Sequence, residues 1–392
     1  MKLASRIEKL PPYLFAEIDR RIGRAKAAGV DVINLGIGDP DEPTPAPIVE
    51  ALRHSAGRAE HHRYPPYQGL RSYREAVARF FGRRFGVQLD PDREVLALIG
   101  SKEGLAHLAW ATMEPGAVAL VPDPGYPVYA TAVALAGGEA FSVPLRPERG
   151  FLPDLDAVPG EVVRRARLLF INYPNNPTGA VAGLEFFERV VNWAKAHDVL
   201  VCHDAAYSEL TFDNRRAPSI LQVPGARDVT IEFHSLSKSF NMTGWRIGWA
   251  CGSAAAIDAL ARLKTHLDSG VFGAIQEAAT EALDTQAAFT QGMRGLYQSR
   301  RDRVVAALRE MGWKIEPPGG AIYVWVPLPP GWDSMSFAAE LLDRTGVVVT
   351  PGIGYGQQGE GFVRISLTVP DRRLDEALGR WKAQGLAFEP RR

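Results

Sequence analysis

The sequence predicts an α/β protein, with a large domain whose mostly parallel sheet is covered by helices and a smaller α+β domain. Two observations lead to this prediction. Short, almost fully apolar runs bounded by Gly, Pro, Asn or Asp follow one another between residues 95 and 252. Strands of this kind are buried on both faces, as in parallel sheets covered by helices. Helical patterns separate the runs.

The chain begins with helical patterns. Residues 14–28 carry Leu14, Ile18 and Ile22 on one side and charged residues on the other, which is typical of an amphipathic helix. The next segments predict a short strand at 31–35, ended by glycine, and helices at 45–54 and 69–84.

Six apolar runs predict the strands of the large domain: VLALIG, AVALVP, RLLFINY, VLVCHDA, VTIEFHS and WRIGWACG. Helices are expected after the first run, in EGLAHLAWATM, and at 126–137, 183–197 and 253–268. A helical tract at 274–311 leads to a second set of strands, IYVWVPL, VVVTP and FVRISLT, and to a helix at 370–384. We therefore expect a large domain at 46–285 and a small domain built from 1–45 and 286–392.

Composition narrows the class of protein. Forty-five basic and 45 acidic residues give a formal net charge of zero, which disfavours nucleic acid and anionic membranes as partners. The sequence contains no run of 18 apolar residues, so we expect no membrane span. The N-terminus lacks the apolar core of a signal peptide. Two cysteines, Cys202 and Cys251, are too few for a disulfide framework, so we expect buried thiols in the cytoplasm.

The segment SLSKSFNMTGWRIG, residues 235–248, follows an apolar strand. Ligands bind at the carboxyl ends of strands in open α/β sheets. The hydroxyls of Ser235 and Ser237 and the fork of Arg246 suit a phosphate group. Lys238 lies between them, and a lysine enclosed by apolar walls becomes a usable amine nucleophile. The alternative is an ordinary solvated lysine.

Three further motifs lie at predicted strand ends. NYPNNPTG, at 172–179, is either a turn or a loop that presents an Asn amide to a ligand. HDAAYSEL, at 203–210, places Asp204 where an unpaired carboxylate would be costly, so we expect a cationic partner or a helix-cap role. GSKEG, at 100–104, is either an ordinary turn or a set of backbone N–H groups facing an anion.

Other patterns are set aside. GYGQQG, at 354–359, has the spacing of a dinucleotide-binding loop, but a strand follows it instead of a helix. His61 and His62 are adjacent and would point apart, so we expect no metal site there. Glu103 and His107 have helical spacing and are expected to be a solvated pair.

Taken together, the four motifs resemble those of the class I/II aminotransferases of fold type I, which use pyridoxal 5′-phosphate (PLP). The resemblance runs from Tyr13 to Arg364, with Asn-Pro-x-Gly, Asp-x-x-Tyr, Ser-x-x-Lys and a later arginine in the family's order. It implies amino acid and 2-oxo acid substrates. It also implies a homodimer with shared active sites.

The resemblance implies a role for each matching residue. Lys238 would hold PLP covalently and act as general acid and base, Asp204 would pair with the ring nitrogen, and Asn176 and Tyr207 would contact the ring hydroxyl. The remaining implied contacts are ring stacking by Tyr126; phosphate binding by Ser101, Lys102, Ser235, Ser237, Arg246 and the partner's Tyr64; and substrate binding by Tyr13, Gly38, Asn176 and Arg364.

Within the family, the segments GSKEGLAHL, FHSLSKSFNMTGWRIGWACG and VVVTPGIGYGQQGEGFVRISLTVP are most similar to LL-diaminopimelate aminotransferases. These enzymes exchange the amino group with 2-oxoglutarate and glutamate in lysine biosynthesis. Some alanine aminotransferases share GSKEGLAHL and PGIG, so alanine or another amino acid is an alternative substrate. A PLP-dependent C–S lyase is a further alternative, because the cofactor motifs are shared.

Overall fold

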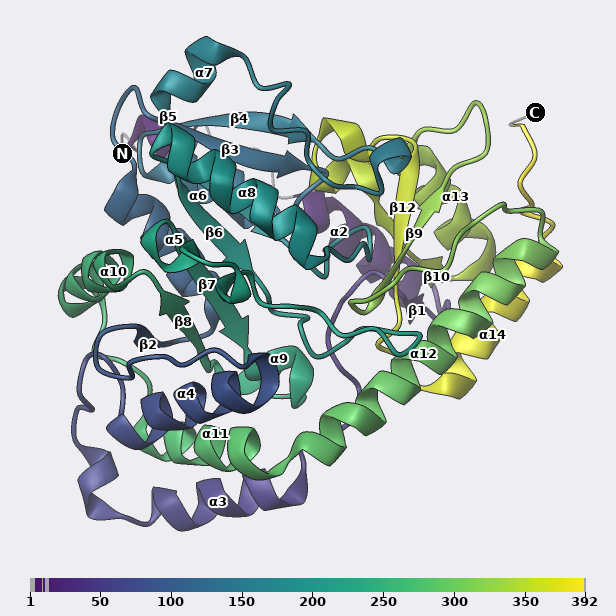
Figure 1. Cartoon of the computed structure of the whole chain (residues 1–392). Helices are drawn as coiled ribbons and strands as arrows, with labels where there is room; N and C mark the ends of the chain where they lie inside the picture. The colour runs from purple at the N-terminus through teal and green to yellow at the C-terminus, as the bar shows by residue number, and fades with distance from the viewer. Residues whose placement is uncertain (1–3, 9, 11–13, 391–392) are drawn as a thin grey trace.

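A computed structural model describes residues 4–8, 10 and 14–390 of the chain. Its centre is a seven-stranded sheet whose strands are parallel except for the pairs that β8 makes with β2 and β7 (Figure 1). From edge to edge the strands are β2 (Val95–Leu98), β8 (Gly248–Gly252), β7 (Thr230–Ser235), β6 (Leu200–Asp204), β5 (Ala166–Asn172), β3 (Val118–Asp123) and β4 (Glu139–Pro144). The predicted α/β class with a mostly parallel sheet is confirmed.

Helices cover both faces of this sheet. One face packs its apolar side chains against α5 (Ser101–Thr112), α6 (Val128–Leu135) and α10 (Ala254–Leu267). The apolar side chains of the other face cluster with α4 (Arg71–Phe85) and α8 (Leu184–His197), and the cluster continues into α11 (Gly273–Thr285) and into α3 (Ala46–Ala56), which packs on α11. Buried strands therefore need no polar face, which is why their sequences read as continuous apolar runs.

A separate core forms around two small sheets. β1 (Ile33–Asn34) pairs in parallel with β10 (Val347–Val348), and β12 (Phe362–Ser366) lies between β11 (Thr350–Pro351) and β9 (Tyr323–Pro327). Around them pack α12 (Ala287–Glu310), α13 (Ser334–Thr345) and α14 (Asp371–Ala383). The other described α-helices are the short α1 (Ser5–Glu8), α7 (Gly160–Arg165) and α9 (Leu236–Ser239) and the longer α2 (Leu14–Ala27). We keep the division into 46–285 and the two chain ends as a proposal.

The structure corrects three details of the sequence interpretation. The helical tract at 274–311 is two helices, because the backbone leaves helical geometry at Gln286. VVVTP is divided between β10 and β11, which belong to different sheets. Strand β4 and helix α13 were not predicted: β4 is an edge strand with several exposed residues, so it lacks the continuous apolar run of the inner strands.

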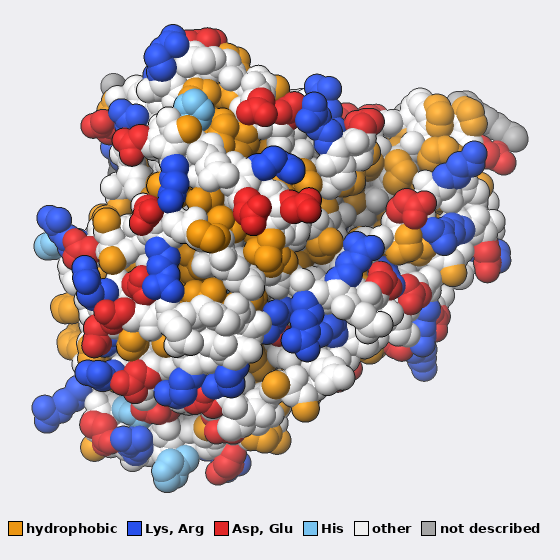
Figure 2. Space-filling model, viewed as in Figure 1, with side chains coloured by type: hydrophobic (Ala, Val, Ile, Leu, Met, Phe, Trp, Pro, Cys, Tyr) orange, Lys and Arg blue, Asp and Glu red, His pale blue; other side chains and the backbone are white. Residues whose placement is uncertain are grey.

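Charged side chains of both signs alternate over the face shown in Figure 2, without an extended basic area on that face. This mixture matches the balanced composition. Among the described residues, no helix has both the length and the apolar character that crossing a bilayer requires.

Candidate active site

The site forms where three parallel strands end at the same edge of the large sheet. β5 ends at Asn172, β6 at Asp204 and β7 at Ser235. The register places Asn172 beside Asp204, so the motifs after these strands are neighbours in space. Three of the four motifs singled out in the sequence therefore meet, as expected for the carboxyl edge of such a sheet.

Lys238 lies on α9 (Leu236–Ser239), a single turn directly after β7. Its Nζ donates a hydrogen bond to the carbonyl oxygen of Gly38 at 2.5 Å. Burial lowers the pKa of the Lys238 amine, which favours the neutral, nucleophilic form. Gly38 must be glycine for this approach, since a Cβ there would lie 2.1 Å from the hydroxyl of Tyr323.

Asp204 is a buried carboxylate at the end of β6. Its Oδ2 accepts a hydrogen bond from the Tyr129 hydroxyl at 2.8 Å, and its Oδ1 accepts one from the Ala206 N–H at 3.3 Å. Among the described residues no Lys, Arg or His forms an ion pair with it, and burial raises the pKa of its carboxyl group. A cationic ligand nitrogen would restore the balance.

The NYPNNPTG segment is both a turn and part of the site. The Asn172 amide donates to the Asp204 carbonyl at 2.7 Å, and its Oδ1 accepts from the Asn176 N–H at 2.8 Å. Asn176 is buried, and its Oδ1 accepts a hydrogen bond from Arg364 Nη1 at 2.8 Å. Sequence reasoning missed Asn172, because an Asn beside a turn is common.

Arg364 comes from β12 of the small sheets and is buried at 5 % exposure. Its guanidinium lies 3.9 Å from the ring centroid of Tyr323 and 5.0 Å from that of Tyr355. Nη2 donates to the Gly36 carbonyl at 2.6 Å, and Nε has no hydrogen-bond partner among the described residues. A buried guanidinium with free donor capacity suits a substrate carboxylate.

Two tyrosines complete the wall beside Arg364. The hydroxyls of Tyr207 and Tyr323 lie 3.0 Å apart, and burial raises the pKa of Tyr207. Tyr323 was not predicted, and neither was Tyr129. Tyr323 lies inside an apolar strand run, where an aromatic residue normally indicates only core packing.

The fourth motif lies beside Arg246 and the end of β7. Ser101 is the first residue of α5, so its N–H is one of those without an intrahelical acceptor. Gly100 has a positive φ, and a Cβ there would lie 2.2 Å from Arg246 Nη2. Gly248 brings Ser101 close to the end of β7, because a Cβ on it would lie 3.2 Å from the Ser101 nitrogen. These contacts gather the residues predicted to bind phosphate: Ser101, Ser235, Ser237 and Arg246.

Arg246 is exposed, and so are two of the remaining predicted residues, Lys102 and Tyr64. Lys102 is exposed, and its Nζ lies 5.8 Å from the ring centroid of Tyr126, which is half-buried. The side chain of Tyr64 is 87 % exposed. Tyr13 lies outside the described residues.

The site fits PLP on its own features. The half-buried Lys238 supplies an amine that can react with the cofactor aldehyde. Asp204 forms no ion pair with a described residue, and a protonated pyridine ring would give it a positively charged partner. The N-terminal N–H groups of α5 and the guanidinium of Arg246 are donors of the kind that bind a phosphate group. The donor set therefore matches the reactive group, the ring and the phosphate of this cofactor.

Glu103 and His107 are not the solvated pair expected from the sequence. They are half-buried, and Asp268 lies close enough to share a metal ion with them. Lys264, however, donates to Glu103 Oε1 at 2.6 Å and to Asp268 Oδ2 at 2.9 Å, so a lysine already supplies the positive charge. His61 and His62 each bond a backbone carbonyl, of Ser55 and Ala56 respectively.

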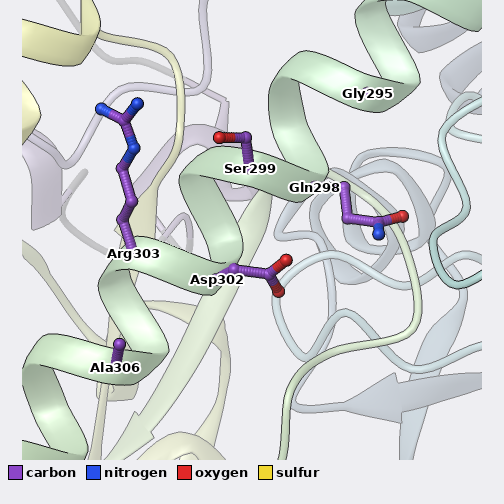
Figure 3. A pocket seen from close by; sticks show the side chains of 6 residues that line it. All are labelled: Gly295, Gln298, Ser299, Asp302, Arg303 and Ala306. Carbon is purple, nitrogen blue, oxygen red and sulfur yellow. The ribbon is translucent and has the colours of Figure 1, made fainter.

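A hollow of about 560 Å³ lies on α12. Figure 3 shows that its lining side chains come from this one helix: Gly295, Gln298, Ser299, Asp302, Arg303 and Ala306. No residue of the predicted site lines it. Binding sites usually enclose a ligand between several elements, so this surface is not the catalytic site.

The comparisons with known proteins agree with this geometry. The sequence profile of the family described as "Aminotransferase class I and II" matches residues 30–380. LL-diaminopimelate aminotransferase 2 of Nostoc sp. is 54% identical over 99% of this chain and 100% of its own length. LL-diaminopimelate aminotransferase of Desulforudis audaxviator is 57% identical over 96% of each chain.

Solved structures share the whole fold. Substrate-bound BacF from Bacillus subtilis superimposes with a TM-score of 0.95 at 38% identity, covering 99% of both chains. A probable N-succinyldiaminopimelate aminotransferase from Thermus thermophilus has a TM-score of 0.90 at 39% identity, covering 94% of this chain and 99% of its own. With the profile match and the full-length relatives, these results show that the chain belongs to the class I and II aminotransferases, which are PLP-dependent transaminases of fold type I.

Proposed function

We propose that this protein is an LL-diaminopimelate aminotransferase that exchanges the amino group with 2-oxoglutarate and glutamate, and that it serves lysine biosynthesis. The supporting observation is the identity of 54% to 57% to relatives of that name over nearly the whole chain. The local segments that resembled this group in the sequence, around Ser101 and Lys238, also lie together in the site.

The proposed roles are those that the family resemblance implies for the residues gathered at the site. When bound, PLP supplies an electron-accepting ring that stabilises negative charge at the substrate Cα. Lys238 would hold the cofactor, and Asp204 would keep its ring nitrogen protonated by charge pairing. Asn176 and Tyr207 would bind the ring hydroxyl. Tyr126 would pack on the ring, and Ser101, Lys102, Ser235, Ser237 and Arg246 would bind the phosphate.

Lys238 would also transfer the proton that leaves the substrate Cα. Burial already lowers the pKa of its amine, so the displaced amine would be available to accept a proton from the substrate Cα. The same amine can return the proton to the reactive carbon of the cofactor. Gly38, whose carbonyl oxygen accepts from Lys238 Nζ, would border the substrate at this point.

Arg364 orients the substrate. The bonds to Asn176 and Gly36 hold its guanidinium, and Tyr323 packs on its face. A bidentate contact between the substrate carboxylate and this arginine would determine which Cα bond is perpendicular to the cofactor ring. The Tyr13 contact stays a prediction from the resemblance.

We further propose a homodimer in which Tyr64 of each chain reaches the phosphate site of the other. Tyr64 is exposed, and Tyr67 and Phe272 beside its loop are also exposed aromatic residues. The segment before Phe272 lies against the segment that carries Tyr64, since a Cβ on Gly270 would lie 3.3 Å from Pro65. Exposed aromatic residues are enriched at protein interfaces.

A cytoplasmic location is part of the proposal. Cys202 and Cys251 are buried and unpaired, as is usual for proteins of a reducing compartment.

Single-turnover half-reactions test the substrate. The PLP-loaded protein is mixed in turn with LL-diaminopimelate, L-alanine, L-aspartate, L-glutamate and an aromatic amino acid, and the absorbance of the bound cofactor is followed. Fast conversion with LL-diaminopimelate and glutamate, but not alanine, is expected. Fast conversion with alanine and none with LL-diaminopimelate would contradict the proposed substrate. Ammonia release without a 2-oxo acid would instead indicate a lyase.

A further inference from the structure

A buried carboxylate lies between two histidines on the back of the large sheet. Glu232 and His234 are on β7, and His203 is on β6 directly before Asp204. Successive residues of a strand point to opposite faces, so His203 lies on the face away from Asp204. Exposure is 0 % for His203 and Glu232 and 2 % for His234. The roles proposed above use none of these three residues.

Glu232 is fully bonded. Its Oε2 accepts from His203 Nδ1 at 3.1 Å, from the Ser219 hydroxyl at 2.9 Å and from the Ile220 N–H at 3.0 Å. Its Oε1 accepts from His234 Nε2 at 2.6 Å. Burial opposes ionisation of Glu232, but the bonds from the two histidines outweigh it and hold the pKa of this carboxyl group below its usual value.

The surroundings decide the protonation of His203. Its Nδ1 faces the Glu232 carboxylate, and its Nε2 faces the backbone carbonyl of Tyr173 at 3.1 Å. An ionised carboxylate and a carbonyl are acceptors only, so both ring nitrogens must carry a hydrogen. His203 is then an imidazolium that balances the charge of Glu232. His234 is not restricted in this way, because its Nδ1 faces the hydroxyl of Ser208 at 3.4 Å.

The position of this imidazolium connects it with the cofactor site. Tyr173 begins the turn that carries Asn176, and Asn172 ties the same turn to the Asp204 carbonyl at 2.7 Å. The turn is therefore held from two sides of β6, by His203 and by Asn172. In addition, the two histidines oppose the rise that burial causes in the pKa of Asp204.

We propose that His203, charged by Glu232, is a positioning residue that holds the Asn176 turn and Asp204 in place for the cofactor ring. The assignment rests on the proposed site roles of Asn176 and Asp204. It does not depend on which amino acid is the substrate. His203 itself touches neither the cofactor nor the substrate.

Two matched variants separate the bonds of His203. An Asn amide nitrogen occupies roughly the place of Nδ1, and a Gln amide nitrogen that of Nε2. His203→Asn keeps the donor to Glu232 and loses the bond to Tyr173, whereas His203→Gln keeps the bond to Tyr173. His203→Gln in turn loses the donor to Glu232. Both variants remove the positive charge and keep one bond each, so their comparison shows whether the bond to Tyr173 or the bond to Glu232 supports PLP binding.

The measurement is the dissociation constant of PLP for each apo-protein, with the thermal unfolding midpoint recorded in parallel. The proposal expects His203→Asn to bind PLP up to about tenfold more weakly than His203→Gln, the upper end of what one neutral hydrogen bond contributes. Equal affinity of both variants, or parent-like affinity of His203→Asn, would overturn the proposal. Substrate choice is measured separately on the parent protein, so failure of the proposed function is distinguishable.

A second measurement uses only the parent protein, so it does not depend on whether a variant folds. Nitrogen-15 NMR of the parent apo-protein, labelled at histidine, distinguishes an imidazolium from a neutral ring. The buried ring bonded to Glu232 is expected to show hydrogens on both nitrogens at pH 7. If every buried histidine ring showed one unprotonated nitrogen, the charged His203 would be excluded and the proposal refuted.

Discussion

Gly100→Ala tests whether the N-terminus of α5 and Arg246 form the phosphate site. The added Cβ would lie 2.2 Å from Arg246 Nη2 and 2.8 Å from its Cζ. An ordinary nonbonded contact is about 3.5 Å, so the guanidinium must retreat by about 1 Å. Hydrogen bonds weaken steeply under such a displacement, and those to charged groups contribute about 1.5–3 kcal/mol. PLP should therefore bind roughly 10- to 100-fold more weakly.

The backbone adds a separate cost. Gly100 has φ 76° and ψ 151°, a backbone region that residues other than glycine rarely adopt. The alanine should therefore lower the free energy of unfolding by about 1–3 kcal/mol. Gly86→Ala is the matched control. Gly86 also has a positive φ, of 68°, but a Cβ there meets nothing within 4 Å. This control should lose about 1–2 kcal/mol of stability and keep PLP as tightly as the parent.

The assay is equilibrium binding of PLP to apo-protein, combined with urea unfolding of each variant. If Gly100→Ala bound PLP as tightly as the parent while losing stability like Gly86→Ala, Arg246 would not hold the phosphate. The strain alone would then explain the change.

Four other predictions concern the site and its support. Lys238→Ala should abolish turnover and the covalent attachment of PLP, seen in the visible spectrum; appreciable residual transamination would contradict the role of this lysine. Asp204→Asn should lower kcat by about 100-fold or more, because preorganised electrostatic contacts contribute at least that much, and a parent-like kcat would argue against ring pairing. Arg364→Lys should weaken substrate binding by about 10- to 100-fold in kcat/KM through loss of the two-fold carboxylate contact, with PLP affinity as the control that stays unchanged. Glu232 has a lowered pKa in the folded protein, so it releases its proton more readily there than in the unfolded chain. Its stabilisation is therefore present above the unfolded value of 4.5 and is lost as the pH falls below it, and Glu232→Gln should flatten the acid branch of the unfolding curve of the apo-protein; an unchanged acid branch would contradict this.

The sequence by itself determined the class of fold and the site motifs. Strands buried on both faces must be apolar throughout, so they were visible without a structure. Polar residues that end such strands, such as Asp204, contrast with the apolar run before them. Lys238 and Asn176 were placed by the same local signal, a polar segment after a strand, together with the resemblance of the four motifs to one family.

Only the tertiary structure could decide how residues distant in the chain support these motifs. Tyr129 donates to Asp204 and Tyr323 packs on Arg364, yet both read as core aromatic residues. The His203–Glu232 pair joins two strands through their register, which a single sequence does not encode locally. Hydrogen bonds and packing of this kind depend on the distance between elements in space. Local sequence patterns report only on neighbours along the chain, and this is why these partners emerged only when the sheet was assembled.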